Sequence, residues 1–487
     1  MKTKSLGQVF TPDNIVSILL EDARFVVSEL DVKRMKTLEP SFGDGAILLP
    51  VARGLAHAAI KYTRATKSKK TAAEIVDDNL YGIELDPELY EATVSKIREE
   101  LYDIYGLIVS LPNLVCADAL ESDWSDFDYI IGNPPYVRIH NIQKDDRTKI
   151  KSSGSIYGTS DLYVAFLQHF SQKMRQGTGR LCFITPNSWL RNASQKSFRQ
   201  ELINSNKLEK FRDFGSEKVF KGFNTYTAVT TLSEAHKDAV GAVVGGLSLS
   251  VPYESLKALR GAPIAFNDGS LVVPSEVTLG TICRAHNGVC TLGNKLFLIT
   301  DEDIEKFSLE TVFIQDAIKA SHNTKNPVEK IFFPYVFSAE GKAVPITEEE
   351  FCSSSPNLYS FMKLRKKELE TRAVDKGALW FHYGRSQALH SINKTRLAVS
   401  VILGPANTRL LWRKIPPMTV LYYGLYVIPD ESSMEESQLM KVLESESLRS
   451  HVESLARTWG GNYKSFSSKI LNNFDMTKYV TGDKTHG

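Results

Sequence analysis

The stretch LEPSFGDGAIL, residues 38–48, combines the end of a short apolar strand, a turn with two glycines and the start of a helix. Gly43 and Gly45 allow the backbone of the turn to approach a ligand closely, because glycine has no Cβ atom. Glu39 and Asp44 place negative charge where a phosphate-binding loop would avoid it. The turn therefore favours a cationic ligand over a phosphate.

Short apolar strands alternate with helical segments on both sides of this turn. Strands are expected at residues 36–39, 79–84, 113–116, 128–131, 180–185, 211–214 and 225–232. Such alternation indicates a parallel α/β sheet. The sequence predicts a Rossmann-like α/β domain with about seven strands in residues 1–240, and the alternation ends beyond it.

Two further strands of this predicted sheet also end in acidic residues. Glu84 ends the strand in YGIELDP, where a carboxylate can accept hydrogen bonds from both ribose hydroxyls of a nucleoside. Asp118, in CADAL, is placed to accept from an adenine amino group. Carboxyl ends of parallel strands meet at one edge, so the pattern favours S-adenosylmethionine, a nucleoside with a sulfonium and an α-amino group.

The fourth strand runs directly into Asn133, Pro134, Pro135 and Tyr136. An exocyclic adenine amine is a poor nucleophile, and two oxygen acceptors for its hydrogens activate it. The side-chain carbonyl of Asn133 and the backbone carbonyl of Pro134 can supply them on a loop that the prolines fix. Tyr136 can stack on a base that has left the duplex. These residues predict methyl transfer to an amine.

A flipped base needs a second apolar wall, and VFKGFNTYTAV, residues 219–229, offers Phe220 as the better candidate and Phe223 as the other. No cysteine follows a proline or lies in such a loop, which disfavours C5-cytosine methylation through covalent attack. Residues 143–159 are charged and rich in Ser and Gly, and we expect a loop that could cover the site.

At these motifs the sequence resembles the gamma-class N6-adenine DNA methyltransferases of type II restriction–modification systems, such as the TaqI-like and PstI-like enzymes. The motifs are, in order, GQVFTP, EPSFGDG, GIELDP, CADAL, NPPY, DLYVAFLQHF and GRLCFITPNSWL. All of them lie within residues 7–232. The resemblance implies a class I S-adenosylmethionine-dependent fold and a separate DNA-recognition domain.

The resemblance also implies a set of cofactor-binding residues. They are Thr11, Pro12, Glu39, Gly43, Gly45, Glu84, Asp118 and Asn133, with Asp161 nearby. Asn133, Pro134 and Tyr136 form the expected catalytic set. The sequence departs from the family pattern in the long interval between the glycine turn and Glu84, which contains a Lys-rich stretch at residues 67–70.

Residues 241–487 are expected to form a mixed α/β target-recognition domain for double-stranded DNA. Residues 361–414 hold twelve Lys and Arg against three Asp and Glu, a local excess of +9 that suits phosphate contact. Within it WFHYGRSQAL places Arg385 among aromatic residues, and arginine suits bidentate contacts to guanine. Residues 288–299 and 460–471 resemble the family's recognition domain more loosely.

The composition sets outer limits on function. The net charge of +2 alone does not indicate a nucleic-acid partner, and five cysteines without zinc-type spacing predict neither a metal site nor a disulfide framework. No apolar stretch approaches the ~18 residues of a membrane span, so we expect a cytoplasmic protein without a membrane partner.

Several alternatives remain open at this point. N4-cytosine methylation needs the same acceptors, and RNA or protein-glutamine methyltransferases share the NPPY chemistry. A DNA-binding protein with a vestigial cofactor fold is disfavoured by the intact Asn133–Tyr136 loop. No nuclease constellation is evident, so a cognate restriction endonuclease acting on the same site is expected as a separate chain.

Overall fold

The computed structural model describes residues 10–137, 161–215, 217–220, 225–267, 269–321, 327–339, 341–429, 434–458 and 462–480. The chain divides into two compact units, Met1–Val273 and Pro274–Gly487, which are taken in turn below. Within the described residues, no helix is both long and apolar enough to cross a membrane.

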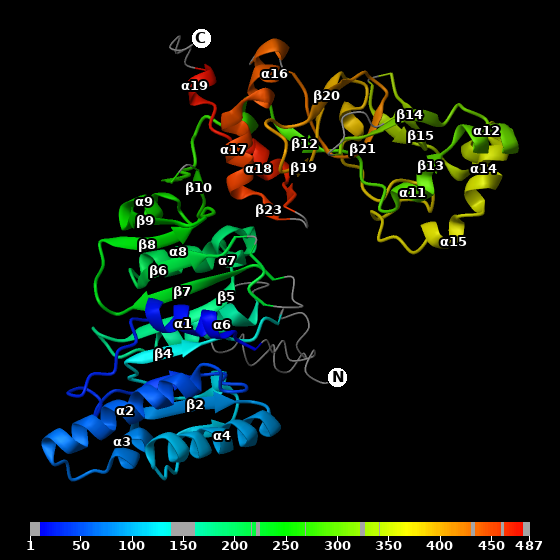
Figure 1. Ribbon diagram of the computed structural model, residues 1–487. Helices are drawn as coiled ribbons and strands as arrows, with labels where there is room; N and C mark the ends of the chain where they lie inside the picture. Colours follow the sequence, from blue (N-terminus) through cyan, green and yellow to red (C-terminus); the bar gives the residue numbers. More distant parts are fainter. Residues whose placement is uncertain are drawn as a thin grey trace. The chain divides into compact units, whose positions relative to one another are not determined.

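A nine-stranded sheet forms the centre of the first unit, in the order β3-β2-β1-β4-β5-β7-β6-β8-β9. Figure 1 shows these strands following one another from β2 to β9. Strands β3, β2, β1, β4 and β5 are mutually parallel, while β7 lies antiparallel between β5 and β6. The strands are β1 (Thr37–Glu39), β2 (Leu80–Glu84), β3 (Leu114–Cys116), β4 (Tyr129–Gly132), β5 (Arg180–Pro186), β6 (Leu208–Asp213), β7 (Thr227–Ser233), β8 (Ala239–Val244) and β9 (Leu247–Pro252).

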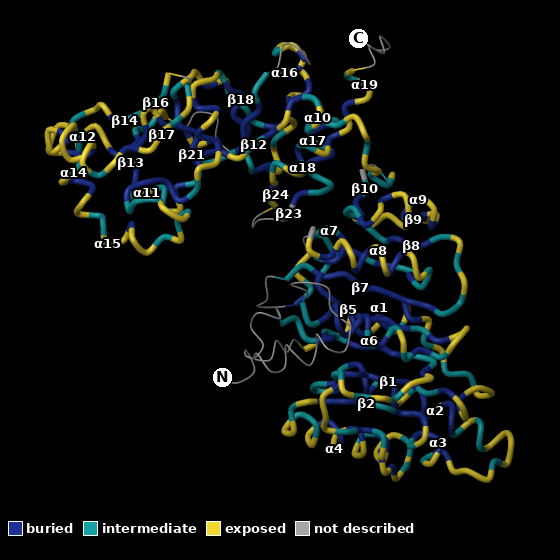
Figure 2. The backbone as a smooth tube through the Cα atoms, turned by 180° about the vertical axis from the view of Figure 1, so that it is seen from behind, coloured by how far each residue is buried: buried dark blue, intermediate teal, exposed yellow. Residues whose placement is uncertain are grey.

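Helices cover both faces of this sheet, and one apolar cluster fills each side. The first cluster includes side chains of α1 (Asp13–Asp22), α2 (Leu48–Thr66), α3 (Ala72–Asn79) and α4 (Pro87–Tyr105). The second includes side chains of α6 (Leu162–Ser171), α7 (Ser188–Arg191), α8 (Lys196–Asn204) and α9 (Tyr253–Ala258). Figure 2 shows buried strands between helices whose outer surfaces are exposed. This layered arrangement confirms the predicted α/β architecture.

The sheet is larger than the predicted seven strands. Strands β8 and β9 form a hairpin around Gly245 and Gly246, and β8 pairs parallel with β6. Both glycines have positive φ, 57° and 82°, which suits the tight turn. The hairpin was not predicted because it breaks the strand–helix alternation, and the boundary predicted after residue 240 falls inside β8. The first compact unit ends later, at Val273.

The second unit is a mixed α/β structure with several smaller sheets. One four-stranded sheet has the order β12-β22-β18-β20 and the other has the order β13-β15-β14-β21. Their strands are β12 (Ala285–Asn287), β13 (Leu298–Ile299), β14 (Ile314–Lys319), β15 (Glu329–Phe332), β18 (Arg396–Val399), β20 (Trp412–Ile415), β21 (Val420–Tyr423) and β22 (Leu425–Val427). Its helices include α12 (Asp301–Phe307), α13 (Glu348–Ser354), α14 (Pro356–Lys363), α16 (Glu436–Glu444), α17 (Glu446–Leu455) and α18 (Ser468–Asn472).

Candidate active site at the carboxyl edge of the sheet

Four parallel strands bring the predicted site residues of the first unit to one edge. Glu39 ends β1, Glu84 ends β2, Asp118 follows β3 and Asn133 follows β4. The strand order reverses between β1 and β4, because β2 lies on one side of β1 and β4 on the other. Ligands of open α/β sheets bind outside the carboxyl ends at such a reversal.

The turn after β1 has the backbone that its glycines predict. Gly43 and Gly45 have φ angles of 50° and 80°, in the left-handed region where glycine carries no Cβ penalty. A Cβ atom on Gly45 would lie 2.7 Å from Cγ2 of Thr93, whereas nothing lies within 4 Å of the Cβ position of Gly43. The Oγ1 of Thr93 donates to the carbonyl of Gly43 over 2.7 Å and fixes the turn against α4.

Glu39 is the most deeply buried carboxylate at this edge, with 3% of its surface exposed. Its Oε2 atom is buried and has no hydrogen-bond partner among the described residues. Burial raises the pKa of Glu39 well above its ordinary value, and the nearby charges of Asp44 and Glu84 raise it further. A cation placed beside this carboxyl group would relieve both effects.

Glu84 and Asp118 accept backbone hydrogen bonds from the turns and loops that follow β1, β2 and β3. The two oxygens of Glu84 accept from the amides of Gly43 and Asp86, at 2.8 and 2.9 Å. Glu84 is 5% exposed, and its carboxylate joins the glycine turn to the start of α4. Asp118 accepts from the amide of Leu120 at 3.0 Å and is exposed.

Asn133 is tied to two parts of the chain that are distant in sequence. Its Nδ2 donates to Oγ1 of Thr11 over 3.2 Å, and its backbone carbonyl accepts from Oγ of Ser41 over 3.2 Å. Thr11 is 9% exposed, and Pro12 caps α1 immediately after it. The contact with Thr11 fixes the orientation of the side-chain amide of Asn133.

Tyr136 and Phe220, the two predicted base-stacking residues, contact each other beside this loop. Their ring centroids lie 6.1 Å apart with an interplanar angle of 68°, an edge-to-face contact. The hydroxyl of Tyr136 donates to the carbonyl of Ile184 over 3.2 Å, and burial raises its pKa well above the ordinary value. Phe220 is 2% exposed and belongs to the apolar core. A base stacked between both rings would have to separate them.

These features suit a ligand that carries positive charge and the polar groups of a nucleoside. S-adenosylmethionine fits the chemistry of these residues. Its positive charge suits the buried Oε2 of Glu39, and its bulk suits the open space over Gly43. Its hydroxyl and amino groups suit the carboxylates of Glu84 and Asp118. Within the described part of the chain, no group of three His, Cys, Asp or Glu side chains is arranged to hold a metal ion.

Comparison with known proteins supports a methylase relationship for this part of the chain. Residues 64–220 match a family model described as Eco57I restriction-modification methylase. The Type II methyltransferase M.BanIII of Aneurinibacillus aneurinilyticus is 28% identical over 229 residues, which cover 46% of this chain and 37% of that protein. M.PaeR7I of Pseudomonas aeruginosa is 27% identical, with 47% and 40% of the two chains covered.

The matched chain spans about two fifths of the length of these curated relatives. Among solved structures, the Type IIL restriction-modification enzyme MmeI in complex with DNA has a TM-score of 0.63 at 15% identity. The match covers 95% of this chain and 64% of MmeI. At this identity the likeness concerns the fold alone, which agrees with the predicted α/β sheet and mixed α/β second unit.

In the second unit, seven of the twelve basic residues counted in residues 361–414 bind backbone carbonyls or carboxylates of the protein itself. Three arginines donate to backbone carbonyls: Arg365 to Leu296 and Leu298, Arg372 to Thr291, His382 and Trp380, and Arg396 to Ile392 and Thr419. Four further cations have carboxylate partners, in the pairs Lys366–Glu370, Arg385–Asp375, Arg409–Glu444 and Lys414–Glu436. Glu370 and Asp375 are already subtracted in the excess of +9, whereas Glu436 and Glu444 lie outside that window. These two outside partners and the three bound arginines reduce the charge that could face DNA phosphates.

Arg385 has local partners of its own. It pairs with Asp375 at 3.3 Å and donates to the carbonyl of Ala373 at 2.5 Å, while 42% of its side chain is exposed. The aromatic residues that precede it, Phe381 and Tyr383, belong to the apolar core of this unit. The interleaving of aromatic and basic residues in this segment thus reflects core packing around an exposed arginine.

Two residues at the carboxyl edge were not predicted. Ser41 lies within the EPSFGDG motif, and its position between Glu39 and Gly43 could have marked it. Thr93 lies within α4, where no feature of the sequence separates it from other buried helix positions. Phe223 and the predicted covering loop at residues 143–159 lie outside the described residues. On either side of the segment that contains this loop, the amide of Leu162 donates to the carbonyl of Val137.

Proposed function

We propose that this protein transfers a methyl group from S-adenosylmethionine to the exocyclic N6 amine of adenine in double-stranded DNA. The observation that carries the proposal is the position of Asn133 after β4, next to the acidic strand ends of β1 and β2, with its amide nitrogen held by Thr11. The proposed reaction needs a carbonyl acceptor for an amine beside residues that suit a cationic cofactor, and this position of Asn133 supports it.

In this proposal the acidic edge binds and orients the cofactor. Glu39 would lie beside its α-amino group, Glu84 would accept from the ribose hydroxyls, and Asp118 would accept from the adenine amino group. Gly43, Gly45, Thr11 and Pro12 would border it through backbone and small side chains. When bound, S-adenosylmethionine supplies an electrophilic methyl group on a sulfonium.

The NPPY loop acts on the target base. The Oδ1 of Asn133 and the backbone carbonyl of Pro134 would accept the two hydrogens of the amine and direct its lone pair to the methyl carbon. As the nitrogen becomes methylated, these two oxygens would stabilise the positive charge that develops on it, and one of its protons would pass to solvent. Tyr136 and Phe220 would hold the flipped base, which no enzyme can reach inside the duplex.

The second unit would recognise the DNA sequence, with Arg385 as a candidate contact once its pairing with Asp375 is exchanged for DNA. The relatives named above are Type II methyltransferases, and the matching family model is described as a restriction-modification methylase. By analogy, the protein would protect host DNA from a cognate endonuclease on another chain.

The test is to incubate the purified protein with methyl-labelled S-adenosylmethionine and plasmid DNA, RNA or protein in parallel. The products are hydrolysed and the labelled nucleoside or amino acid is identified. The proposal expects N6-methyladenine from DNA. Label in N4-methylcytosine would contradict the base assignment, and label confined to RNA or protein would contradict the DNA assignment.

A further inference from the structure

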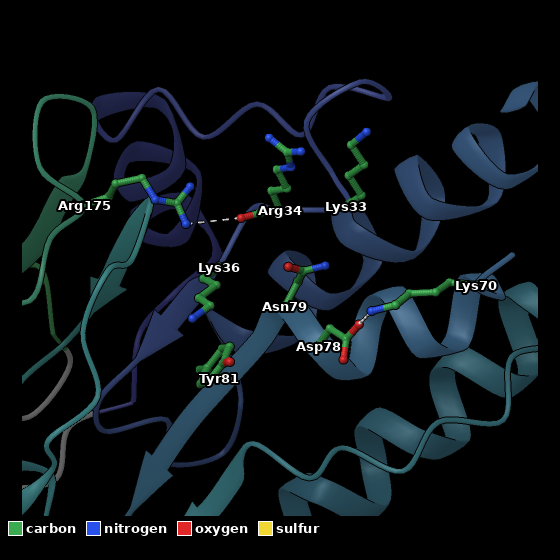
Figure 3. A pocket seen from close by; sticks show the side chains of 8 residues that line it. All are labelled: Lys33, Arg34, Lys36, Lys70, Asp78, Asn79, Tyr81 and Arg175. Carbon is green, nitrogen blue, oxygen red and sulfur yellow. Dashed lines mark hydrogen bonds and ion pairs between the residues drawn. The ribbon is translucent and has the colours of Figure 1, made fainter. Parts of the chain in front are cut away.

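The opposite edge of the same sheet carries a cavity of about 630 Å³. Its lining residues come from the segment before β1, the loop before α3, the end of α3, the start of β2 and the loop before β5. They are Lys33, Arg34, Lys36, Lys70, Asp78, Asn79, Tyr81 and Arg175. Figure 3 shows these side chains around one space at the amino ends of the strands.

The cavity holds an excess of positive charge. Two of its five cations have carboxylate partners, since Lys70 pairs with Asp78 and Arg175 pairs with Asp126 and Asp128. Among the described residues, no ion pair joins Lys33, Arg34 or Lys36 to a carboxylate. Three cations within four positions of the chain repel one another, and an anion between them would remove that repulsion.

These three cations lie around the rim and wall of the cavity, and the Nζ of Lys33 lies 5.8 Å from the ring centroid of Tyr62. Lys33 and Arg34 are exposed, while Lys36 is half-buried with its Nζ 5.7 Å from the ring centroid of Tyr81. The guanidinium of Arg34 presents a planar fork of donors that matches two oxygens of a phosphate. The carbonyl of Arg34 accepts from Nη2 of Arg175 over 3.3 Å, which joins two distant segments at the wall of the cavity.

The Lys-rich stretch at residues 67–70, which departs from the family pattern, contributes to this same cavity through Lys70. Lys67 ends α2 with a φ of 54°, and the loop brings Lys70 to Asp78 near the end of α3. The carboxyl edge of the sheet, with Glu39 and Asn133, lies at the other ends of the strands. This basic cavity is therefore distinct from the proposed methyl-transfer site.

We infer that the cavity is a binding site for a compact phosphate-bearing polyanion. Its volume lies within the ~300–1,000 Å³ of small-molecule sites and exceeds what a single phosphate fills. Several linked phosphates would engage Arg34, Lys33 and Lys36 together. The same phosphate chemistry is offered by a free polyphosphate or nucleotide and by the backbone of DNA, so the experiment must separate these sources.

The test titrates inorganic tripolyphosphate into the full chain by calorimetry. The wild type should bind one equivalent, and the double variant Lys33→Gln/Arg34→Gln should bind roughly ten- to hundredfold more weakly. Both side chains are exposed, so the variant should melt at the wild-type temperature. Lys96→Gln removes an exposed lysine of α4 outside the cavity and should bind as the wild type does.

A short duplex added as competitor identifies the source of the phosphates. Displacement of tripolyphosphate from the wild type, with weaker duplex binding by the double variant, would assign the cavity to DNA backbone. Duplex binding that is equal in both proteins would assign it to a free polyphosphate. Absence of tripolyphosphate binding by the folded wild type, or equal binding by the double variant, would overturn the inference. Methyl transfer is not measured, so failure of the proposed function leaves this result intact.

Discussion

The two edges of the nine-stranded sheet differ in charge. At the carboxyl edge, the acidic residues Glu39, Glu84 and Asp118 lie at or just after the ends of β1, β2 and β3. At the amino edge, β1 is preceded by the basic residues Lys33, Arg34 and Lys36. The acidic edge has a buried Oε2 of Glu39 without a hydrogen-bond partner among the described residues. The basic edge has a cavity with three cations that no described carboxylate pairs with. The same strands thus present opposite charge to ligands at their two ends.

The charge at each edge of the sheet therefore says more about the ligands of this protein than the net charge of the whole chain does. The net charge of the whole chain is +2, which conceals both regions. The carboxylates of the acidic edge come from segments that are distant in sequence, whereas the three cations of the basic edge that no described carboxylate pairs with lie within residues 33–36. The variants below separate the two edges, beginning with the largest expected effect.

Asn133→Ala should lower the rate of methyl transfer by about 10²–10³-fold, the usual cost of losing one preorganised hydrogen-bonding group at a reacting centre. The affinity for S-adenosylmethionine should change little, because the carboxylates of the acidic edge remain. Single-turnover transfer and equilibrium binding measure the two quantities separately. Equal losses of rate and cofactor affinity would assign Asn133 to binding instead.

Glu84→Gln should weaken S-adenosylmethionine binding by about tenfold, because a neutral amide replaces a charged acceptor. The amide keeps one oxygen for the backbone of the turn, so folding should persist. Lys33→Gln/Arg34→Gln at the basic edge is the matched control and should bind the cofactor as the wild type does. If both variants bound S-adenosylmethionine equally weakly, the cofactor could not be assigned to the carboxyl edge.

Glu39→Gln should change the dependence of stability on pH. Because burial raises the pKa of Glu39, the folded chain keeps a proton that the unfolded chain releases. Its stabilising contribution is present below the ordinary glutamate pKa of ~4.3 and is lost as pH rises toward the raised folded value. Glutamine cannot ionise, so the variant does not lose stability in this way as pH rises. It should therefore melt a few degrees above the wild type at about pH 8.

The same variant should bind S-adenosylmethionine more weakly, so stability and function should move in opposite directions. Thermal melts without cofactor at about pH 5 and pH 8 test the first part, and calorimetry tests the second. A melting difference that is the same at both pH values would show that Glu39 does not titrate as its burial requires.

Thr11→Val should slow transfer by about three- to tenfold, since the Nδ2 of Asn133 would lose its acceptor. Thr11→Ser retains the hydroxyl and should restore most of the rate. Single-turnover rates of the three proteins provide the measurement. A valine variant with wild-type rate would show that the contact with Thr11 does not orient Asn133.

Tyr136→Phe should have the smallest effect. It removes the hydrogen bond to the carbonyl of Ile184, for which we expect about 1 kcal/mol of lost stability, and it retains an aromatic ring for stacking. Denaturant unfolding measures the first quantity, and transfer should remain within about twofold. A loss of transfer as large as that of Asn133→Ala would mean that the hydroxyl takes part in the reaction.

The acidic edge was predictable because its residues end strands that the sequence marks clearly. In YGIELDP the apolar run ends at Glu84, and in FDYIIGNPPY it ends before Asn133. Parallel pairing then places both at one edge whatever the lengths of the connections. The contact of Thr93 with the glycine turn was not predictable, because it depends on the rotation of α4 against that turn.

The basic edge and the second unit show where sequence reasoning was limited. Arg175 reaches the cavity from the loop before β5, far in sequence from Arg34, and only the fold brings them together. Arg365, Arg372 and Arg396 count as positive charge in any sequence window, although their guanidinium groups bind backbone carbonyls. Composition records a charge but does not record the direction in which its side chain points.

The most direct test of the account is to titrate S-adenosylmethionine into the wild type, Glu84→Gln and Lys33→Gln/Arg34→Gln, with melting curves to verify folding. The account predicts binding of one equivalent by the wild type, about tenfold weaker binding by Glu84→Gln and no change in the double variant. A folded wild type that does not bind S-adenosylmethionine, or a double variant that loses binding while Glu84→Gln retains it, would contradict the assignment of the carboxyl edge to the cofactor.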